Sequence, residues 1–365
     1  MLEQGKISNI QFMLLIIISR LMLTVTYLSY IDSPPWNQDA WISDLLSFPM
    51  HIFLVIPIYS LAKRFPQLTI IESAEVILGF GGKVIGFLYV GFFLHRTSFL
   101  LRQFGEFLTA IPYPETPMIV FIGITALFAA YAVNQGIETI CRVGEIVSPI
   151  ILTSLILIFL MMAKDVDITT LKPFLESGMG PIAYGAFIVA ARTTSVMFLP
   201  MLSPYINKPD KIKNSMLLAL FILTLYFIPI TITTIGVFGL EQASKLNFPF
   251  YHLVRMVRIG QFLERIDAIF IGFWVLSMFI NVAAHYYLTV LGTAQVLKLK
   301  DYRYIIAPMG TIIVVVSLIQ SDNMIELSEF LSYKVFTWYA LIFTFILPLI
   351  LLFTAILRKK RADIT

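Results

Sequence analysis

The stretch IAYGAFIVAARTTSVMFLP, residues 182–200, joins an apolar helical run to four consecutive polar residues, Arg192 to Ser195. The apolar part is typical of a helix in a membrane, where polar side chains and irregular backbone are costly to expose to lipid. The polar part is best explained by unwound backbone that lines a cavity inside a helical bundle. The stretch therefore predicts a membrane protein with a helix that is interrupted where it lines a cavity.

The whole chain has the composition of a multi-pass membrane protein. Of its 365 residues, 58% are hydrophobic and 13% are charged, against about 25% charged in soluble domains. The mean hydropathy is +0.86. A spanning helix needs about 20 apolar residues, so we expect an all-α fold of about ten spans in one transmembrane domain, 1–365. The predicted helices cover residues 8–29, 40–62, 83–111, 117–134, 143–163, 181–203, 212–238, 264–294, 303–320 and 335–357.

The basic residues predict the orientation of these helices. If the N-terminus is inside, the inner segments carry 15 Lys and Arg residues and the outer segments carry 7. Cytoplasmic loops of membrane proteins carry the excess of Lys and Arg, so both termini are expected in the cytoplasm. The net charge of +4 is explained by these loops, and a nucleic-acid partner is not expected.

The reactive residues are too few for the common catalytic and metal sites. The chain has one cysteine, Cys141, and four histidines, and it contains neither a His-Glu-x-x-His motif nor a Gly-rich phosphate loop. No Ser/His/Asp set can be assembled convincingly. We therefore expect no enzyme, no cofactor and no metal site.

Two long loops suggest an internal repeat. Segments 64–82 and 245–263 each follow the second helix of a five-helix set, and each contains Phe-Pro followed by a short amphipathic stretch. A set with an odd number of helices must be followed by an inverted copy, as in many transporter folds. We expect one repeat over about 8–163 and an inverted one over about 181–357. The amphipathic stretches could be helices at the membrane interface or ordinary juxtamembrane segments.

The helix predicted over 83–111 carries the densest set of polar residues. Arg102 and Glu106 are four residues apart and can pair on one face, and a structural ion pair is the favoured interpretation. Arg96 lies near the middle of the helix without a local acidic partner. An arginine at this depth requires an anion, which could be a ligand carboxylate or an acidic residue of another helix.

Other predicted helices also carry polar residues at membrane depth. Ser19, Arg20, Thr24 and Thr26 lie in the first helix. Ser277, Asn281 and His285 recur every four residues on one face of the eighth. Hydrogen bonding between helices explains such residues at least as well as ligand binding does.

Several segments, in this order and spacing, resemble the spore germination permease family, the B subunits of germinant receptors in the amino acid–polyamine–organocation superfamily. The resemblance covers nearly the whole chain, and no single segment carries it alone. The similar segments are Asp167 to Ile182, Ile7-Ser8 with Gln11, Arg102 with Glu106, Phe262 to Arg265 followed by Trp274, and the basic end Leu357 to Arg361.

The resemblance implies a five-plus-five inverted repeat with helices 1 and 6 broken at midplane. The breaks would fall at Met22-Leu23-Thr24 and at Thr193-Thr194-Ser195. Relatives often have glycine at the first break and this chain has none, so the extent of unwinding there is open. The implied ligand-binding residues are Met22, Leu23, Thr24, Arg96, Phe99, Thr193, Thr194, Ser195, Ser277 and Asn281.

The resemblance also implies a role and partners. A small germinant, expected to be an amino acid, would bind at midplane in the spore inner membrane. Partner subunits, an A subunit and a lipoprotein C subunit, would read the resulting helix arrangement.

Two other functions are compatible with the same fold. One is an amino-acid transporter coupled to sodium or to protons, with His285 as the better proton-binding candidate because histidine titrates near neutral pH. The other is a scaffold whose polar residues only hold helices together.

Overall fold

The computed structural model describes residues 5–27, 34–35, 37–257 and 266–361. These residues are nearly all helical, and a single bridge, Ile7 to Ile206, is the extended pairing among them. Of the segments that carry the resemblance, Phe262 to Arg265 lies outside the described residues. The helices are α1 (Asn9–Tyr27), α2 (Ala40–Arg64), α3 (Ile70–Leu78), α4 (Phe80–Ala110), α5 (Met118–Asn134), α6 (Ile137–Met162), η1 (Ile168–Leu171), α7 (Met179–Ala191), η2 (Thr194–Met197), α8 (Phe198–Leu202), η3 (Ser203–Tyr205), η4 (Pro209–Lys211), α9 (Ile212–Lys245), α10 (Pro249–Met256), α11 (Ile266–Val296), η5 (Tyr302–Ile305), α12 (Ile306–Ile319), α13 (Met324–Leu331), α14 (Phe336–Leu341), η6 (Ile342–Ile346) and α15 (Leu347–Leu357).

The all-helical integral membrane fold is confirmed. In the described part of the chain, eight stretches of helix are long and apolar enough to cross a membrane, and a bent pair, α7 with residues 194–205, makes a ninth candidate. The remaining predicted span is α5, which has 17 residues and lies at the lower limit for a spanning helix. The count of ten and the inverted repeat stay predictions.

The predicted break in the first helix is wrong. Helix α1 is continuous from Asn9 to Tyr27 and so runs through Met22, Leu23 and Thr24. No glycine or proline interrupts it, and the Thr26 hydroxyl donates to the Met22 carbonyl at 2.7 Å. Without a residue that favours another backbone conformation, the hydrogen-bonded helix is the lower-energy state in an apolar environment.

The chain does bend where a break in the sixth helix is predicted. Helix α7 ends at Ala191, η2 begins at Thr194, and the two parts differ in direction by 43°. Thr193 has φ −83° and ψ 70°, outside the helical region, and its hydroxyl donates to the Val189 carbonyl. The polar residues Arg192 to Ser195 therefore lie at a bend in the buried backbone. That this bend is the break of a membrane-spanning helix stays a prediction.

The two predicted amphipathic stretches form the short helices α3 and α10. Helix α3 begins with a capping box between Thr69 and Glu72. The apolar face of α10, with Phe250, Leu253 and Val254, is fully buried against α1, α9 and α11. This face packs on protein, so α10 does not fit the expectation of a helix that lays its apolar side on lipid.

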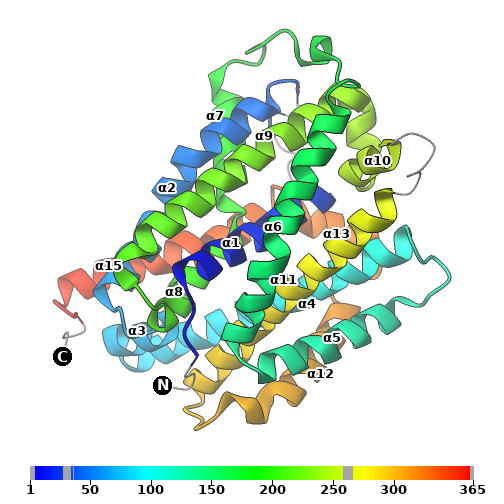
Figure 1. Cartoon of the computed structure of the whole chain (residues 1–365). Coiled ribbons are helices and arrows are strands. Elements are labelled where there is room, and N and C mark those ends of the chain that lie inside the picture. The colour runs from blue at the N-terminus through cyan, green and yellow to red at the C-terminus, as the bar shows by residue number, and fades with distance from the viewer. Residues whose placement is uncertain (1–4, 28–33, 36, 258–265, 362–365) are drawn as a thin grey trace.

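Helix α1 is the centre of the molecule. Of its span, 83% is buried, against 56% or less for the other seven of the eight long stretches. It packs between α9 and α6 on one side and α11 on the other, while α2, α7 and α9 form one group of helices and α4, α5, α11 and α12 another (Figure 1). The polar side chains in the middle and at the end of α1, those of Ser19, Arg20, Thr24 and Thr26, are therefore buried in protein.

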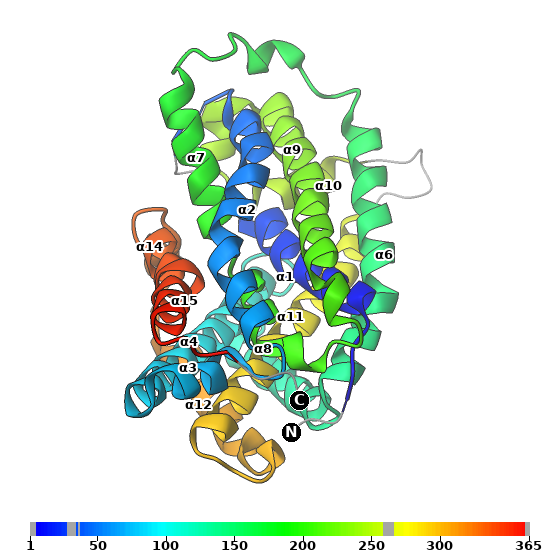
Figure 2. The ribbon, with the colours of Figure 1, turned by 90° about the vertical axis from the view of Figure 1, so that its left-hand side faces the viewer.

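The described ends of the chain lie at one end of the molecule, and the loop that holds η1 lies at the opposite end (Figure 2). The Arg64 Nε–H donates to the Lys360 carbonyl at 2.5 Å, which ties the end of α2 to the C-terminal segment. This arrangement fits a chain that crosses the membrane an even number of times.

Candidate ligand-binding site

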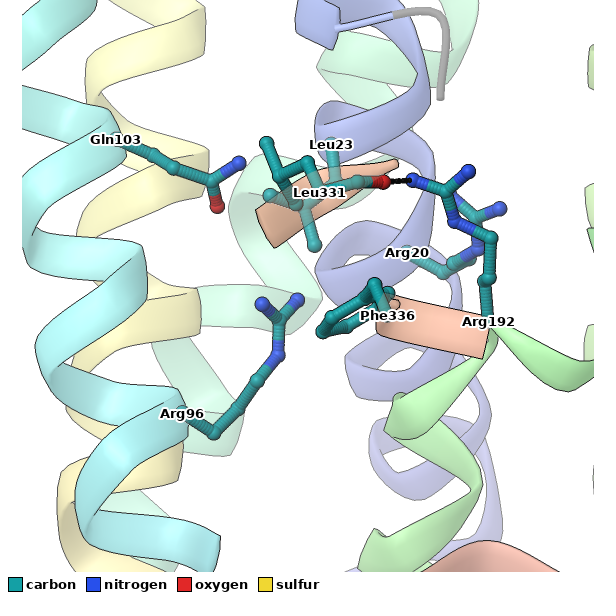
Figure 3. A pocket seen from close by; sticks show the side chains of 7 residues that line it. All are labelled: Arg20, Leu23, Arg96, Gln103, Arg192, Leu331 and Phe336. Carbon is teal, nitrogen blue, oxygen red and sulfur yellow. Dashed lines mark hydrogen bonds between the residues drawn. The ribbon is translucent and has the colours of Figure 1, made fainter. Parts of the chain in front are cut away.

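A small cavity lies between α1, α4, the end of α7 and the segment that joins α13 to α14 (Figure 3). Its volume is about 20 Å³. One water molecule needs about 10–15 Å³ by the same measure, so the cavity in this form is too small for an amino acid. None of its seven lining residues is acidic; they are Arg20, Leu23, Arg96, Gln103, Arg192, Leu331 and Phe336.

Arg96 reaches the cavity from α4 and is 3% exposed. Its guanidinium carbon lies 5.4 Å from the centroid of the Phe336 ring. Among the residues that the structure describes, no carboxylate lies within 4.0 Å of Arg96, and its Nε has no hydrogen-bond partner. A buried guanidinium that lies over an aromatic ring and has no carboxylate beside it among the described residues is a ready binding partner for an anion.

Arg192 reaches the cavity from the opposite side, at the bend after α7. Its side chain donates a hydrogen bond to the Leu331 carbonyl, and its guanidinium carbon lies 5.6 Å from the same Phe336 centroid. The ring of Phe336 therefore lies between two arginines (Figure 3). Both contacts come from the segment 331–336, whose residues Leu331 and Phe336 line the cavity.

Arg20 joins α1 to the bend and to α2. Its Nε–H donates to the Thr193 hydroxyl at 3.2 Å, and the same hydroxyl lies 2.8 Å from His51 Nε2. Arg20 also donates to the Thr24 hydroxyl and lies 5.0 Å over the Phe227 ring. Thr193 and Thr24 thus hold an arginine that lines the cavity and do not line it themselves.

A polar face of α2 was missed by the sequence interpretation. Asp44, Ser47 and His51 are each at most 1% exposed. The Thr231 hydroxyl donates to Asp44 Oδ2 at 2.5 Å, and Asp44 Oδ1 has no partner among the described residues. The signal was present in the sequence, because residues spaced by three and four in an apolar helix share one face.

The structure brings only some of the predicted residues together. Leu23 and Arg96 line the cavity, and Phe99 lies behind Phe336 with ring centroids 6.5 Å apart. Ser277 donates within its own helix to the Phe273 carbonyl, and Asn281 Nδ2 donates to the Ser19 carbonyl of α1 at 3.0 Å. The predicted residues that are buried near the cavity but do not line it are Met22, Thr194 and Ser195.

The predicted ion pair lies on α4, about two turns from Arg96. Arg102 Nη2 and Glu106 Oε1 are 2.7 Å apart, and Arg102 Nη1–H also donates to the Leu318 carbonyl of α12. Both side chains are buried and paired, as a structural role requires. In the described part of the chain, no group of three His, Cys, Asp or Glu residues could hold a metal ion.

Comparison with known sequences identifies the family of the chain. The sequence profile of the family described as spore germination protein matches residues 6–325. The chain belongs to the spore germination protein family. Spore germination protein KB of Bacillus subtilis (strain 168) is 27% identical over 378 residues, which cover 99% of this chain and 98% of that protein. Spore germination protein A2 of the same organism is 23% identical over 89% of this chain and 88% of that protein.

Solved structures show the fold that this spore germination protein shares. A nucleobase-cation-symport-1 family transporter, solved in a closed conformation with bromovinylhydantoin bound, has a TM-score of 0.69 at 13% identity and covers 90% of this chain and 75% of that one. A Na⁺-coupled sialic acid symporter in an outward-open state has a TM-score of 0.53 at 11% identity, over 87% and 76% of the two chains. The chain is therefore a multi-pass membrane protein with a permease-like fold.

Proposed function

We propose that this spore germination protein is the germinant-sensing B subunit of a receptor and that a small nutrient binds at the cavity between Arg96 and Arg192. The observation that carries the proposal is Arg96, a buried cation that has no carboxylate beside it among the described residues and that points into the cavity. A nutrient with a carboxylate, such as an amino acid, would supply the anion.

The small size of the cavity supports a sensing mechanism. At about 20 Å³ the cavity must widen to admit a nutrient, so the ligand favours a wider arrangement of the segment 331–336 over the present one. A ligand that binds one of two arrangements more tightly shifts the population toward it. We propose that an A subunit and a lipoprotein C subunit read this shift in the spore inner membrane, with both termini of this chain in the cytoplasm.

The alternative is a cation-coupled amino-acid transporter, which the shared fold leaves open. In broken-helix transporters, carbonyls of unwound backbone coordinate sodium. Here α1 is continuous through Met22 to Thr24, and the Asn281 amide donates to the Ser19 carbonyl on the same helix. A hydrogen-bond donor at that carbonyl supports the receptor over a sodium-coupled transporter.

Ligand-dependent thermal stability of the purified protein tests the proposal. A panel of amino acids, sugars and nucleosides is compared for the wild type, Arg96→Ala, and the control Arg142→Ala, which removes a cation from an exposed pair with Glu138. We expect one ligand class to raise the Tm of the wild type and the control and to have no effect on Arg96→Ala. An equal rise in Arg96→Ala would place the site elsewhere, and ligand uptake into liposomes would favour the transporter.

A further inference from the structure

A groove lies between α2 and α9, two long helices that pack side by side (Figure 2). Helix α2 contributes Ile52 and Ile56 to its wall, and helix α9 contributes Met216 and Leu217. Ile52 is 36% exposed and Ile56 is 51% exposed. Exposed apolar side chains on a membrane-spanning helix meet lipid. The groove therefore belongs to the surface of the bundle that contacts the bilayer.

One end of this groove carries positive charge. Lys213 lines the groove one turn before Leu217, at the start of α9. On α2, Tyr59 also lines the groove, and Lys63 lies four residues further on, on the same face of the helix. The other cation in the last turn of α2, Arg64, donates to the carbonyls of Ala355 and Lys360. Lys63 and Lys213 are therefore the cations of the two helices at this end of the groove.

No acidic residue neutralises these two lysines. Both are exposed, and among the residues that the structure describes no carboxylate oxygen lies within 4.0 Å of either. Segment 208–213, which leads into α9, carries three lysines and one aspartate, all exposed. Isolated surface lysines are ordinarily solvated. These two differ because an apolar groove begins beside them.

The length of the groove face matches the depth of one leaflet. Ile52 and Lys63 are eleven residues apart on a continuous helix, which corresponds to about 16 Å along its axis. Half of the hydrocarbon core of a bilayer is about 15 Å thick. The apolar wall therefore lies at the depth of an acyl chain, and the lysines lie at the depth of a phosphate.

We propose that the groove between α2 and α9 binds one anionic phospholipid, with an acyl chain against Ile52 and Ile56 and its phosphate between Lys63 and Lys213. The Tyr59 ring lies between these two parts, at the level where tyrosine is enriched in membrane proteins. A zwitterionic lipid is attracted less, because its ammonium group cancels the charge of its phosphate. This site is independent of the cavity beside Arg96.

Native mass spectrometry of the full-length protein in detergent tests the site. Phosphatidylglycerol and phosphatidylcholine with the same acyl chains are titrated separately, and the bound lipid is counted. We expect one phosphatidylglycerol to bind at a lower concentration than phosphatidylcholine. Lys63→Gln and Lys213→Gln are each expected to weaken phosphatidylglycerol binding about fivefold and to leave phosphatidylcholine unchanged. The control Lys300→Gln, which removes an exposed lysine between α11 and η5, should have no effect.

A second pair of variants tests the acyl-chain contact. Ile56→Trp fills the groove and is expected to abolish the preference for phosphatidylglycerol. Leu127→Trp, at a position of α5 that is 73% exposed, is the matched control and should keep that preference. Glycerol 3-phosphate, which has the phosphate without an acyl chain, is expected not to displace the lipid.

Several results would overturn the proposal. Equal binding of the two lipids, or a preference that survives in the double variant Lys63→Gln with Lys213→Gln, would remove the two lysines from the site. Displacement by glycerol 3-phosphate, or full binding in Ile56→Trp, would leave a phosphate patch without a lipid groove. A dimer that disappears in Ile56→Trp would assign the groove to a second copy of this chain.

Discussion

Glu106 accepts two hydrogen bonds from Arg102, and its carboxylate neutralises a guanidinium buried between α4 and α12. Glu106→Gln leaves that guanidinium uncompensated, so we expect the free energy of unfolding to fall by about 3–5 kcal/mol. The measurement is thermal unfolding of the purified variant beside the wild type.

The double variant Arg102→Met with Glu106→Leu is the control for this prediction. It removes both charges and keeps apolar volume, so its loss of stability should be clearly smaller than that of Glu106→Gln. A double variant that unfolds as early as the single one would mean that packing, and not the uncompensated charge, sets the cost.

Single residues divide into those that a sequence can indicate and those that it cannot. Arg96 and Arg102 were predictable as functional or structural groups because a charge in an apolar helix is costly. Leu331 and Phe336 were not predictable, because their role is to cover the cavity and an apolar residue near the end of a spanning helix carries no distinguishing signal. Their importance comes from the tertiary position of residues 331–336.

Close packing of helices gives a second prediction, at the contact of α3 with α4. A Cβ added at Gly82 would lie 2.0 Å from the Ala74 carbonyl oxygen, which is backbone and has no alternative rotamer. We expect Gly82→Ala to lower the free energy of unfolding by about 1–3 kcal/mol through overpacking. Thermal unfolding again provides the measurement.

Gly91 of the same helix is the matched control. No atom lies within 4 Å of a Cβ added there, so Gly91→Ala is expected to be neutral or to stabilise the helix by up to about 1 kcal/mol. If Gly82→Ala were no more destabilising than Gly91→Ala, the α3–α4 contact would be looser than the structure describes.

Among the helices, length and apolar pattern were well predicted, and interruptions were predicted in one case of two. The bend at Thr193 has a sequence cause, since four consecutive polar residues favour an irregular backbone that other helices can solvate. The expected break at Met22 to Thr24 came from the family alone. This sequence contains no residue there that makes unwinding easy, and α1 stays helical.

The molecule as a whole allows a direct test of orientation, because Cys141 is its one cysteine and is buried. In a Cys141→Ala background, Lys172→Cys lies on the exposed loop after η1 and Lys360→Cys lies beyond α15, at the other end of the molecule. If the termini are cytoplasmic, a membrane-impermeant maleimide added to intact cells should label Lys172→Cys alone. Labelling of Lys360→Cys alone would reverse the orientation.

The architecture was predictable from composition and helix length because lipid permits few solutions for a spanning chain. The cavity was not, since it is assembled from α1, α4, α7 and the α13–α14 segment, which are far apart in the sequence. The spacing of polar residues within one helix indicates which of its faces is polar. It does not indicate which other helices pack against that face.

The position of Phe336 between two arginines would let the choice of ligand and the ligand concentration required for a response change independently. In the proposed site, the arginines would determine which molecules are recognised, whereas the stability of the present arrangement of residues 331–336 would determine the concentration at which recognition occurs. Substitutions in that segment would make a dormant spore more or less easily roused by the same nutrient. Strains living on rich and on poor substrates could thus share one chemical preference and differ only in their threshold for leaving dormancy.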